Sequence, residues 1–322
     1  MKTLVLGGAG YIGSVVTRLL LAEGHEVTVL DDCSTGHRDS VSHGVQLVRA
    51  DIRTAGEILA AGGFDAVLHF AAKSLVGESV TNPSLYWHTN VIGSRALVDA
   101  ITEHHVPRLV FSSTAAVYGE PDTFPITEDS PTRPTSTYGS TKLAVDMMIT
   151  NECSATELAA VSLRYFNVAG AAWGAGERHT TETHLIPIAL DAAAGRRDKL
   201  GIYGDDWPTP DGTPIRDYVH VADLARAHVL ALTAAQPGEH LICNLGNGNG
   251  FSVREVIAEV QRVTELEVPV VSAPRRPGDP TRLVASAAKA KERLGWEPEL
   301  DLHAMVADAW EFSNGSVVRG QS

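Results

Sequence analysis

A tyrosine and a lysine four residues apart, Tyr138 and Lys142, could carry acid–base chemistry. On a helix this spacing places both side chains on one face, where the ammonium can favour the phenolate over the phenol. An unperturbed tyrosine has a pKa of about 10, so a base near neutrality needs a shift of about three units, or roughly 4 kcal/mol. Many solvated helices carry the same spacing, so its meaning depends on the rest of the sequence.

A hydroxyl group is the third candidate. Thr114 follows an expected strand at 108–112, in the run Ser112-Ser113-Thr114. Its hydroxyl could bind a substrate alkoxide and relay the proton to Tyr138, or it could simply form a Ser/Thr turn at the strand end. Hydroxyl, phenol and ammonium together make a coherent acid–base set.

A glycine-rich loop near the amino terminus predicts dinucleotide binding. Gly8, Gly10 and Gly13 satisfy G-x-G-x-x-G between an expected strand at 3–6 and an expected helix at 11–22. Glycines at these positions permit a tight turn, let backbone amides approach a pyrophosphate and let the helix pack closely on the strand. A glycine pattern alone could be an ordinary turn, but its place between the first strand and helix favours nucleotide binding.

The end of the second expected strand indicates which dinucleotide. Asp31 lies eighteen positions after Gly13, where a carboxylate can accept hydrogen bonds from the adenosine ribose and repel a 2′-phosphate. No arginine follows until Arg38, so NAD is favoured over NADP. Asp32 either shares this role or begins the next turn.

The elements that must position these groups form an α/β pattern. Buried strands joined by helices predict a doubly wound parallel (Rossmann) sheet, with a smaller, mostly C-terminal α/β substrate-binding lobe. We expect an NAD-binding domain at 1–168, to which part of 215–245 returns, a discontinuous substrate lobe at 169–314 and a frayed tail at 315–322. The expected strands of the sheet are 3–6, 26–30, 46–49, 66–70, 108–112 and 160–165.

Composition restricts the partners. The 322 residues are 44% hydrophobic with a net charge of −13, which disfavours nucleic acid and anionic membranes. Cys33, Cys153 and Cys243 are far apart and lack paired metal-ligand spacing, so reduced thiols and no metal site are expected. The sequence has no signal peptide or membrane-length apolar run, which predicts a cytoplasmic protein.

Several motifs together resemble a known family. The glycine loop, Asp31, the Ser112–Thr114 run and the Tyr138/Lys142 pair are similar to those of the extended short-chain dehydrogenase/reductase family. Within it, the segments 69–72, 76–79, 163–167 and 216–221 resemble the UDP-glucose 4-epimerase branch. The resemblance runs from residue 1 to Pro298, essentially the whole chain.

The resemblance implies a reaction and a set of contacts. Tyr138 would remove the proton of a UDP-hexose C4 hydroxyl while NAD takes the hydride, and the 4-keto sugar would rotate and take the hydride back on its other face. With the glycine loop and the strand ends, it implies cofactor contacts at Gly7, Gly10, Tyr11, Ile12, Gly13, Asp31, Asp32, Asp51, Ile52, Phe70, Ala71, Ala72, Asn90, Ser112, Tyr138, Lys142, Tyr165 and Phe166. It implies substrate contacts at Thr114, Tyr138, Asn167, Leu185, Gly201, Tyr203, Arg216, Arg276, Asp279 and Leu283.

The chemistry of the substrate group fits in part. Arg216 and Arg276 offer planar forks suited to a diphosphate, and Asp279 can accept from ribose hydroxyls. Either arginine could instead be an ordinary surface ion-pair member. Tyr203 could stack on uracil or be a core aromatic. The resemblance further implies a homodimer, through helices near 90–104 and 141–153.

The chain departs from the family pattern at four positions. Thr114 replaces a common serine, Ser74 a lysine near the cofactor phosphates, and His184 a usual asparagine. Leu283 stands where some members have a tyrosine that closes the sugar pocket, so N-acetylated UDP-hexoses are alternative substrates.

Other functions remain to be weighed. A 4,6-dehydratase would need an Asp-Glu pair after the threonine, where this chain has Ala115 and Ala116. A UDP-uronate 4-epimerase is less firmly excluded. A non-catalytic NAD-binding sensor would not need the intact Thr114/Tyr138/Lys142 set.

Overall fold

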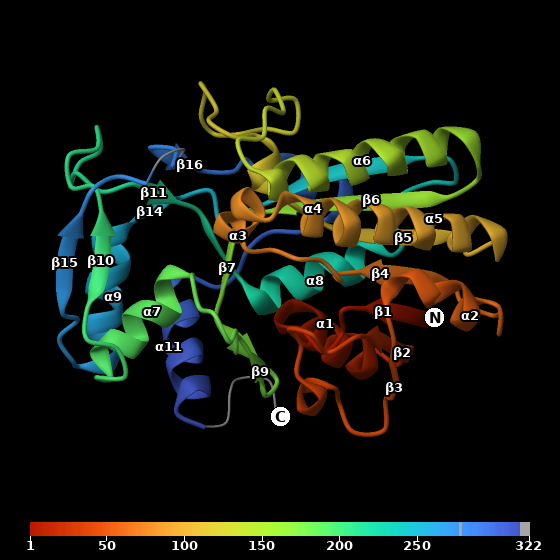
Figure 1. The fold of residues 1–322 in the computed structure, drawn as a ribbon, viewed down its shortest axis with the longest axis horizontal. Helices are drawn as coiled ribbons and strands as arrows, with labels where there is room; N and C mark the ends of the chain where they lie inside the picture. Colours follow the sequence, from red (N-terminus) through yellow and green to blue (C-terminus); the bar gives the residue numbers. More distant parts are fainter. Residues whose placement is uncertain (277–278, 316–322) are drawn as a thin grey trace.

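Seven parallel strands form the central sheet of the computed structural model, which describes residues 1–276 and 279–315. The strand order is β13-β6-β5-β4-β1-β2-β3, so the chain reverses direction across the sheet between β1 and β4 (Figure 1). Ligands of such sheets bind beyond the carboxyl ends of the strands at this switch point. The strands are β1 (Lys2–Leu6), β2 (Glu26–Asp31), β3 (Gln46–Arg49), β4 (Ala66–His69), β5 (Arg108–Thr114), β6 (Ala159–Tyr165) and β13 (His240–Leu245).

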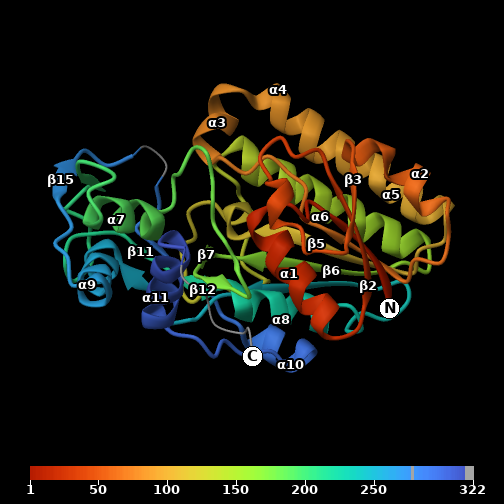
Figure 2. The same cartoon turned by 90° about the horizontal axis from the view of Figure 1, so that it is seen from below.

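Helices cover both faces of this sheet, as Figure 2 shows for α5 and α8. Alternate residues of β1 divide between the two cores, with Val5 packed on the α1 side and Leu4 and Leu6 on the α5 side. One layer contains α1 (Tyr11–Ala22), α8 (Val221–Ala231) and α10 (Ala288–Leu294). The other contains α2 (Ala55–Leu59), α5 (Gly93–Glu103) and α6 (Thr137–Ala155).

Short segments connect these layers. Three helical segments precede α5: α3 (Val76–Thr81), then, after the non-helical Asn82, α4 (Pro83–Tyr86) and the wider turn η3 (Trp87–Ile92). Tight helical turns are η1 (Arg38–Ser40), η2 (Ile52–Thr54) and η4 (Ala115–Val117). The prediction of a doubly wound α/β sheet is confirmed.

A second core lies beside the sheet and contains Leu190, Val256 and Met305. It is built on α7 (Leu185–Ala193), α9 (Val253–Thr264) and α11 (Leu302–Ser313), with the parallel pair β10 (Leu200–Tyr203) and β15 (Val270–Ala273). Small sheets join it to the strand ends: β7 (Asn167–Ala169) with β12 (Tyr218–His220), β8 (Ala171–Ala172) with β9 (Ala175–Gly176), and β11 (Ile215–Arg216) with β14 (Phe251–Ser252) and β16 (Arg282–Leu283).

Capping groups fix where the helices of the site begin. Ser136 accepts a hydrogen bond from the Gly139 amide at 3.1 Å, which places Tyr138 in the first turn of α6. α8 begins at Val221, because 218–220 form β12 and the His220 side chain caps the helix. Of the tail at 315–322, only Gly315 lies within the described residues. No helix in the described ranges is long and apolar enough to span a membrane.

Candidate active site

The three acid–base residues meet at the carboxyl end of β5. Thr114 is the last residue of that strand, and Tyr138 and Lys142 lie one turn apart on α6. The Lys142 Nζ donates to the carbonyl oxygen of Ser112 at 2.8 Å and lies 6.0 Å from the centre of the Tyr138 ring. The helix therefore holds phenol and ammonium on one face, beside the hydroxyl of Thr114.

Burial controls the protonation of this set. Desolvation raises the pKa of Tyr138 to about 12, although a hydrogen bond with Thr114 opposes the shift. Desolvation also lowers the pKa of Lys142 to about 8, against the attraction of Asp146. Within the chain itself desolvation dominates, and the lowering of the phenol pKa expected from Lys142 together with a bound nicotinamide stays a prediction. A base at Tyr138 therefore requires further positive charge beside it.

The glycine loop has the geometry of a phosphate cradle. Gly7 has φ +81°, and a Cβ on Gly13 would lie 2.2 Å from the Gly7 carbonyl oxygen. Gly10 caps α1 without a side-chain hydrogen bond, so the first amides of the helix are not occupied by a cap. These residues fit a dinucleotide, whose pyrophosphate needs backbone donors and a close approach. Tyr11 lies at the helix start and donates to the Gly170 carbonyl at 2.6 Å, while Ile12 packs on the core.

Asp31 supports this loop directly. Its two carboxylate oxygens accept from the Ala9 amide at 2.9 Å and from the Cys33 amide at 2.8 Å. Burial raises the pKa of Asp31 despite these bonds. Asp32 accepts from the Ser34 amide at 2.7 Å and so forms the following turn, one of the two roles considered for it.

Two other expected cofactor residues have structural partners. Asn90 is buried and accepts from the Lys73 amide at 2.8 Å and donates to its carbonyl at 3.0 Å. It also donates to Thr141 on α6 at 3.1 Å, and so ties the end of β4 to the helix that carries Tyr138. Asp51 pairs with Arg53 at 2.7 Å, which lowers the pKa of Asp51.

The remaining expected cofactor residues lie at or just beyond strand ends of the sheet. Phe70 follows β4, and its ring centre is 4.8 Å from that of His228. Ser112 hydrogen-bonds the phenol of Tyr165 on the adjacent strand β6. Ala71 and Ala72 follow Phe70, Phe166 is buried after β6, and Ile52 is buried beneath α5.

The expected substrate residues divide into two groups. Arg216 lies next to Leu283 in the β11–β16 register, and its Nη2 is 3.5 Å from Asp279. The Arg276 guanidinium lies 3.7 Å from the centre of the Tyr203 ring, a cation–π contact. Of the others, Asn167 is paired with Tyr218 across β7 and β12, Leu185 begins α7, and Gly201 lies against the Tyr203 ring.

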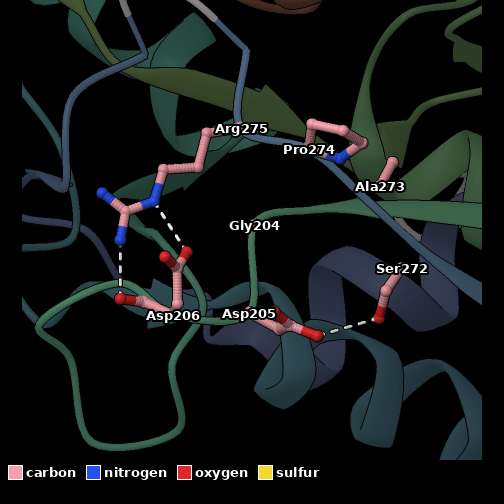
Figure 3. A pocket seen from close by; sticks show the side chains of 7 residues that line it. All are labelled: Gly204, Asp205, Asp206, Ser272, Ala273, Pro274 and Arg275. Atoms are coloured by element: carbon pink, nitrogen blue, oxygen red, sulfur yellow. Dashed lines mark hydrogen bonds and ion pairs between the residues drawn. The ribbon is translucent and has the colours of Figure 1, made fainter.

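An open surface pocket, whose residues the sequence did not identify as a group, lies beside the Tyr203 group. Its volume is about 480 Å³. Figure 3 shows that Arg275 pairs with Asp206 at 2.7 Å, while Ser272 donates to Asp205 at 3.1 Å. The signal available was the loop 203–214, rich in glycine, proline and aspartate. The pocket is lined by Gly204, Asp205, Asp206, Ser272, Ala273, Pro274 and Arg275.

Sequence analysis also missed a buried ion pair behind Lys142. Asp146 and Arg164 approach to 2.9 Å, and Ser113 donates to the same carboxylate at 3.1 Å. Asp146 lies one turn after Lys142 on α6, so the four-residue spacing was visible in the sequence. Its partner on β6 was not.

A parallel sheet with a glycine loop, and a Tyr/Lys pair on a helix beside the end of a strand, define a nucleotide-binding α/β enzyme. Residues 3–246 match the model of the NAD dependent epimerase/dehydratase family, so the chain belongs to that family. The chain is 55% identical to a UDP-glucose 4-epimerase of Corynebacterium glutamicum (98% of this chain, 96% of the relative). It is 56% identical to that of Streptomyces lividans (97% and 95%).

A solved structure shows the same architecture. The UDP-glucose 4-epimerase of Brucella ovis in complex with NAD superimposes with a TM-score of 0.92. The two chains are 44% identical, with 96% of this chain and 97% of that one covered.

Proposed function

We propose that this chain interconverts UDP-glucose and UDP-galactose by NAD-dependent epimerisation at C4. The observation that carries the proposal is the convergence of Thr114, Tyr138 and Lys142 at the sheet edge, in a chain so similar to UDP-glucose 4-epimerases over its whole length. A sheet that only bound a nucleotide would not need an acid–base group there.

The chain's own residues supply positioning and proton transfer. Bound NAD accepts a hydride from C4 and later returns it. Tyr138 takes the proton of the C4 hydroxyl, and Thr114 lies close enough to hydrogen-bond the phenol and to orient that hydroxyl. Return of hydride and proton to the opposite face of the 4-keto sugar completes the inversion, so no external redox partner is consumed.

The raised pKa of Tyr138 makes the reaction depend on binding. Because burial raises the pKa of Tyr138 to about 12 in the chain alone, the phenolate needs positive charge from the nicotinamide ring in addition to the Lys142 ammonium. This coupling favours deprotonation when the oxidised cofactor is in place. It disfavours a reactive phenolate in its absence.

The second lobe would hold the nucleotide. Arg216 lies 3.5 Å from Asp279 and can exchange that contact for a diphosphate oxygen. Tyr203, covered by Arg276, offers an aromatic face to a base. The same lobe would be discontinuous over 169–314, with part of 215–245 returning to the first domain. Its strands at 215–216 and 282–283 pair with one another.

Leu283 supports a second candidate substrate. Leu283 packs against the hydrophobic cluster that contains Ala115 and Phe166. Because leucine is smaller than tyrosine, the site could also admit N-acetylated UDP-hexoses. Assays of UDP-galactose, UDP-GalNAc and a UDP-uronate side by side test this, and undetectable turnover of UDP-GalNAc under conditions where UDP-galactose reacts well would contradict it.

The activity itself has a direct test. Purified protein should interconvert UDP-glucose and UDP-galactose without added NADH. Protein that retains NAD but shows no conversion would instead support a non-catalytic NAD sensor.

We further propose a cytoplasmic homodimer. Cys33, Cys153 and Cys243 are free thiols, as expected of a reducing compartment. Ile92, before α5, is 53% exposed and Met147 on α6 is 60% exposed, so the surface over these helices offers apolar side chains to a second copy. Light scattering should give twice the mass of one chain, and a monomer at micromolar concentration would overturn the assembly.

A further inference from the structure

Four potential metal ligands lie together between β9 and α7, outside the acid–base group. They are Glu177, His179, Glu182 and His184, in the spacing E-x-H-x-x-E-x-H. The segment joins β9 to α7, the first helix of the second lobe (Figure 1). Sequence analysis examined only cysteine spacing for metal sites and considered His184 alone.

The ligand atoms converge on one point. The Nδ1 atoms of His179 and His184 lie 2.8 Å and 2.5 Å from the same Glu177 oxygen. Glu182 lies 3.1 Å from the His184 Nδ1, and all four ligand atoms lie within 4.8 Å of one another. A tetrahedral zinc ion with bonds of about 2.0–2.1 Å holds its ligand atoms about 3.3 Å apart. The distances between ligand atoms in the cluster, from 2.5 Å up to at most 4.8 Å, lie on both sides of that spacing.

Charge also favours a cation here. The Glu177 side chain is 7% exposed and the Glu182 side chain 16%, so neither carboxylate is well solvated. The adjacent Arg178 does not neutralise them, because its guanidinium pairs with Asp39 at 2.5 Å. Two carboxylates and two neutral imidazoles balance one divalent ion. Imidazole nitrogen distinguishes this cluster from the all-oxygen sites preferred by Mg²⁺ and Ca²⁺.

We propose that Glu177, His179, Glu182 and His184 bind one divalent transition-metal ion, with zinc the best match to this donor set. Its role is structural. The metal fixes the segment that crosses from the glycine-loop side to Leu185, the first residue of α7. Arg178 fastens the same segment to the first lobe, since its carbonyl contacts His37 at 2.7 Å.

Metal analysis of the intact protein tests the proposal. Protein expressed with zinc and purified without chelator should contain about one zinc ion per chain. Dialysis against a chelator should remove it, and titration with zinc chloride should restore it and raise the Tm. Mutating a residue that only hydrogen-bonds a metal ligand typically weakens metal binding about 10–100-fold, and loss of a ligand itself should weaken zinc binding more. His179→Ala and Glu177→Gln should therefore contain less than one zinc ion per chain.

Control variants separate metal loss from misfolding. His43→Ala removes an exposed histidine outside the cluster and should keep zinc at the wild-type level. If a cluster variant does not fold, chelation and back-titration of the wild-type chain give the same answer. Zinc below a tenth of stoichiometry in the wild type, together with no rise in Tm on titration, would overturn the site and leave protonated imidazoles as the partners of both carboxylates.

Discussion

The two lobes hold their functional groups in different ways. In the first lobe main-chain atoms fix them: the Ser112 carbonyl holds Lys142 at 2.8 Å, and two amides hold Asp31 at 2.8 and 2.9 Å. In the second lobe contacts between side chains contribute more, as where Arg216, which also donates to the Ile215 carbonyl at 2.9 Å, contacts Asp279 at 3.5 Å. Main-chain contacts at the edge of a regular sheet hold the acid–base residues in fixed positions for the reaction. An ion pair between side chains can instead be exchanged for a contact with the nucleotide and re-formed when the nucleotide leaves. First-lobe changes should therefore lower kcat or cofactor content, and second-lobe changes should raise KM.

The largest effect should come from Tyr138→Phe. Removing a general acid–base group typically costs about 10²–10⁴-fold in rate, and the ring that packs near Lys142 is retained. We expect kcat to fall by that factor while the absorbance of bound NAD and the KM for UDP-galactose stay near wild type. Near-normal turnover by this variant would show that Tyr138 is not the base. It would also contradict the prediction that changes in the first lobe lower kcat.

Gly13→Ala should reduce cofactor content by about tenfold or more, since overpacking against backbone typically costs 1–3 kcal/mol. The new Cβ would lie 2.2 Å from the Gly7 carbonyl oxygen, and main chain cannot move aside as a side chain can. The measurement is the ratio of NAD to chain in purified protein. Gly56→Ala is the matched control, because its Cβ meets only ordinary contact at 3.5 Å and NAD should be retained. Equal NAD content in both variants would contradict the proposal that the glycine loop holds the pyrophosphate.

Local spacing explains which parts of the site the sequence could predict. The glycine loop, Asp31 and the Tyr138/Lys142 pair each lie within one strand–helix unit, so their geometry follows from the period of a helix or the end of a strand. The zinc cluster is equally local, but its spacing was not considered.

The side-chain contacts and pKa shifts that the sequence could not predict depend on residues far apart in the chain. Asp146 meets Arg164 eighteen residues away, and Asp205 meets Ser272 across a small sheet. The raised pKa of Tyr138 in the chain itself could not be predicted for the same reason, because desolvation is the sum over every element packed around the phenol. Helix spacing shows that an ammonium is near, but it does not show how much water has been removed.

Arg216→Gln should act mainly on substrate affinity. A charge-assisted hydrogen bond contributes about 1.5–3 kcal/mol, so KM for UDP-galactose should rise about 10–100-fold with a smaller change in kcat. Steady-state kinetics with UDP as a competitive inhibitor check this, since the inhibition constant should rise in parallel. A fall in kcat without a rise in KM would show that Arg216 acts with the acid–base residues in the chemical step. The proposed difference between the lobes would then be wrong.

The smallest effect should be a shift in pH dependence on Asp146→Asn. Activity requires the Lys142 ammonium, whose pKa is lowered to about 8, so activity should fall as pH rises through that value. Asp146 raises the pKa of Lys142, and its neutral replacement leaves the Arg164 cation unbalanced nearby. Both changes disfavour the ammonium. The alkaline limb of kcat should therefore move to lower pH, by up to about one unit.

A merely structural role for Asp146 would lower the Tm without moving this limb. Breaking a buried ion pair costs about 3–5 kcal/mol, so the variant is assayed at low temperature, where it remains folded. Asp99→Asn is the control, because Asp99 pairs with Arg95 at 2.5 Å on the exposed side of α5 and should leave the profile unchanged. An unshifted alkaline limb in Asp146→Asn would mean that main-chain contacts alone set the protonation of Lys142, which would make the contrast between the lobes sharper.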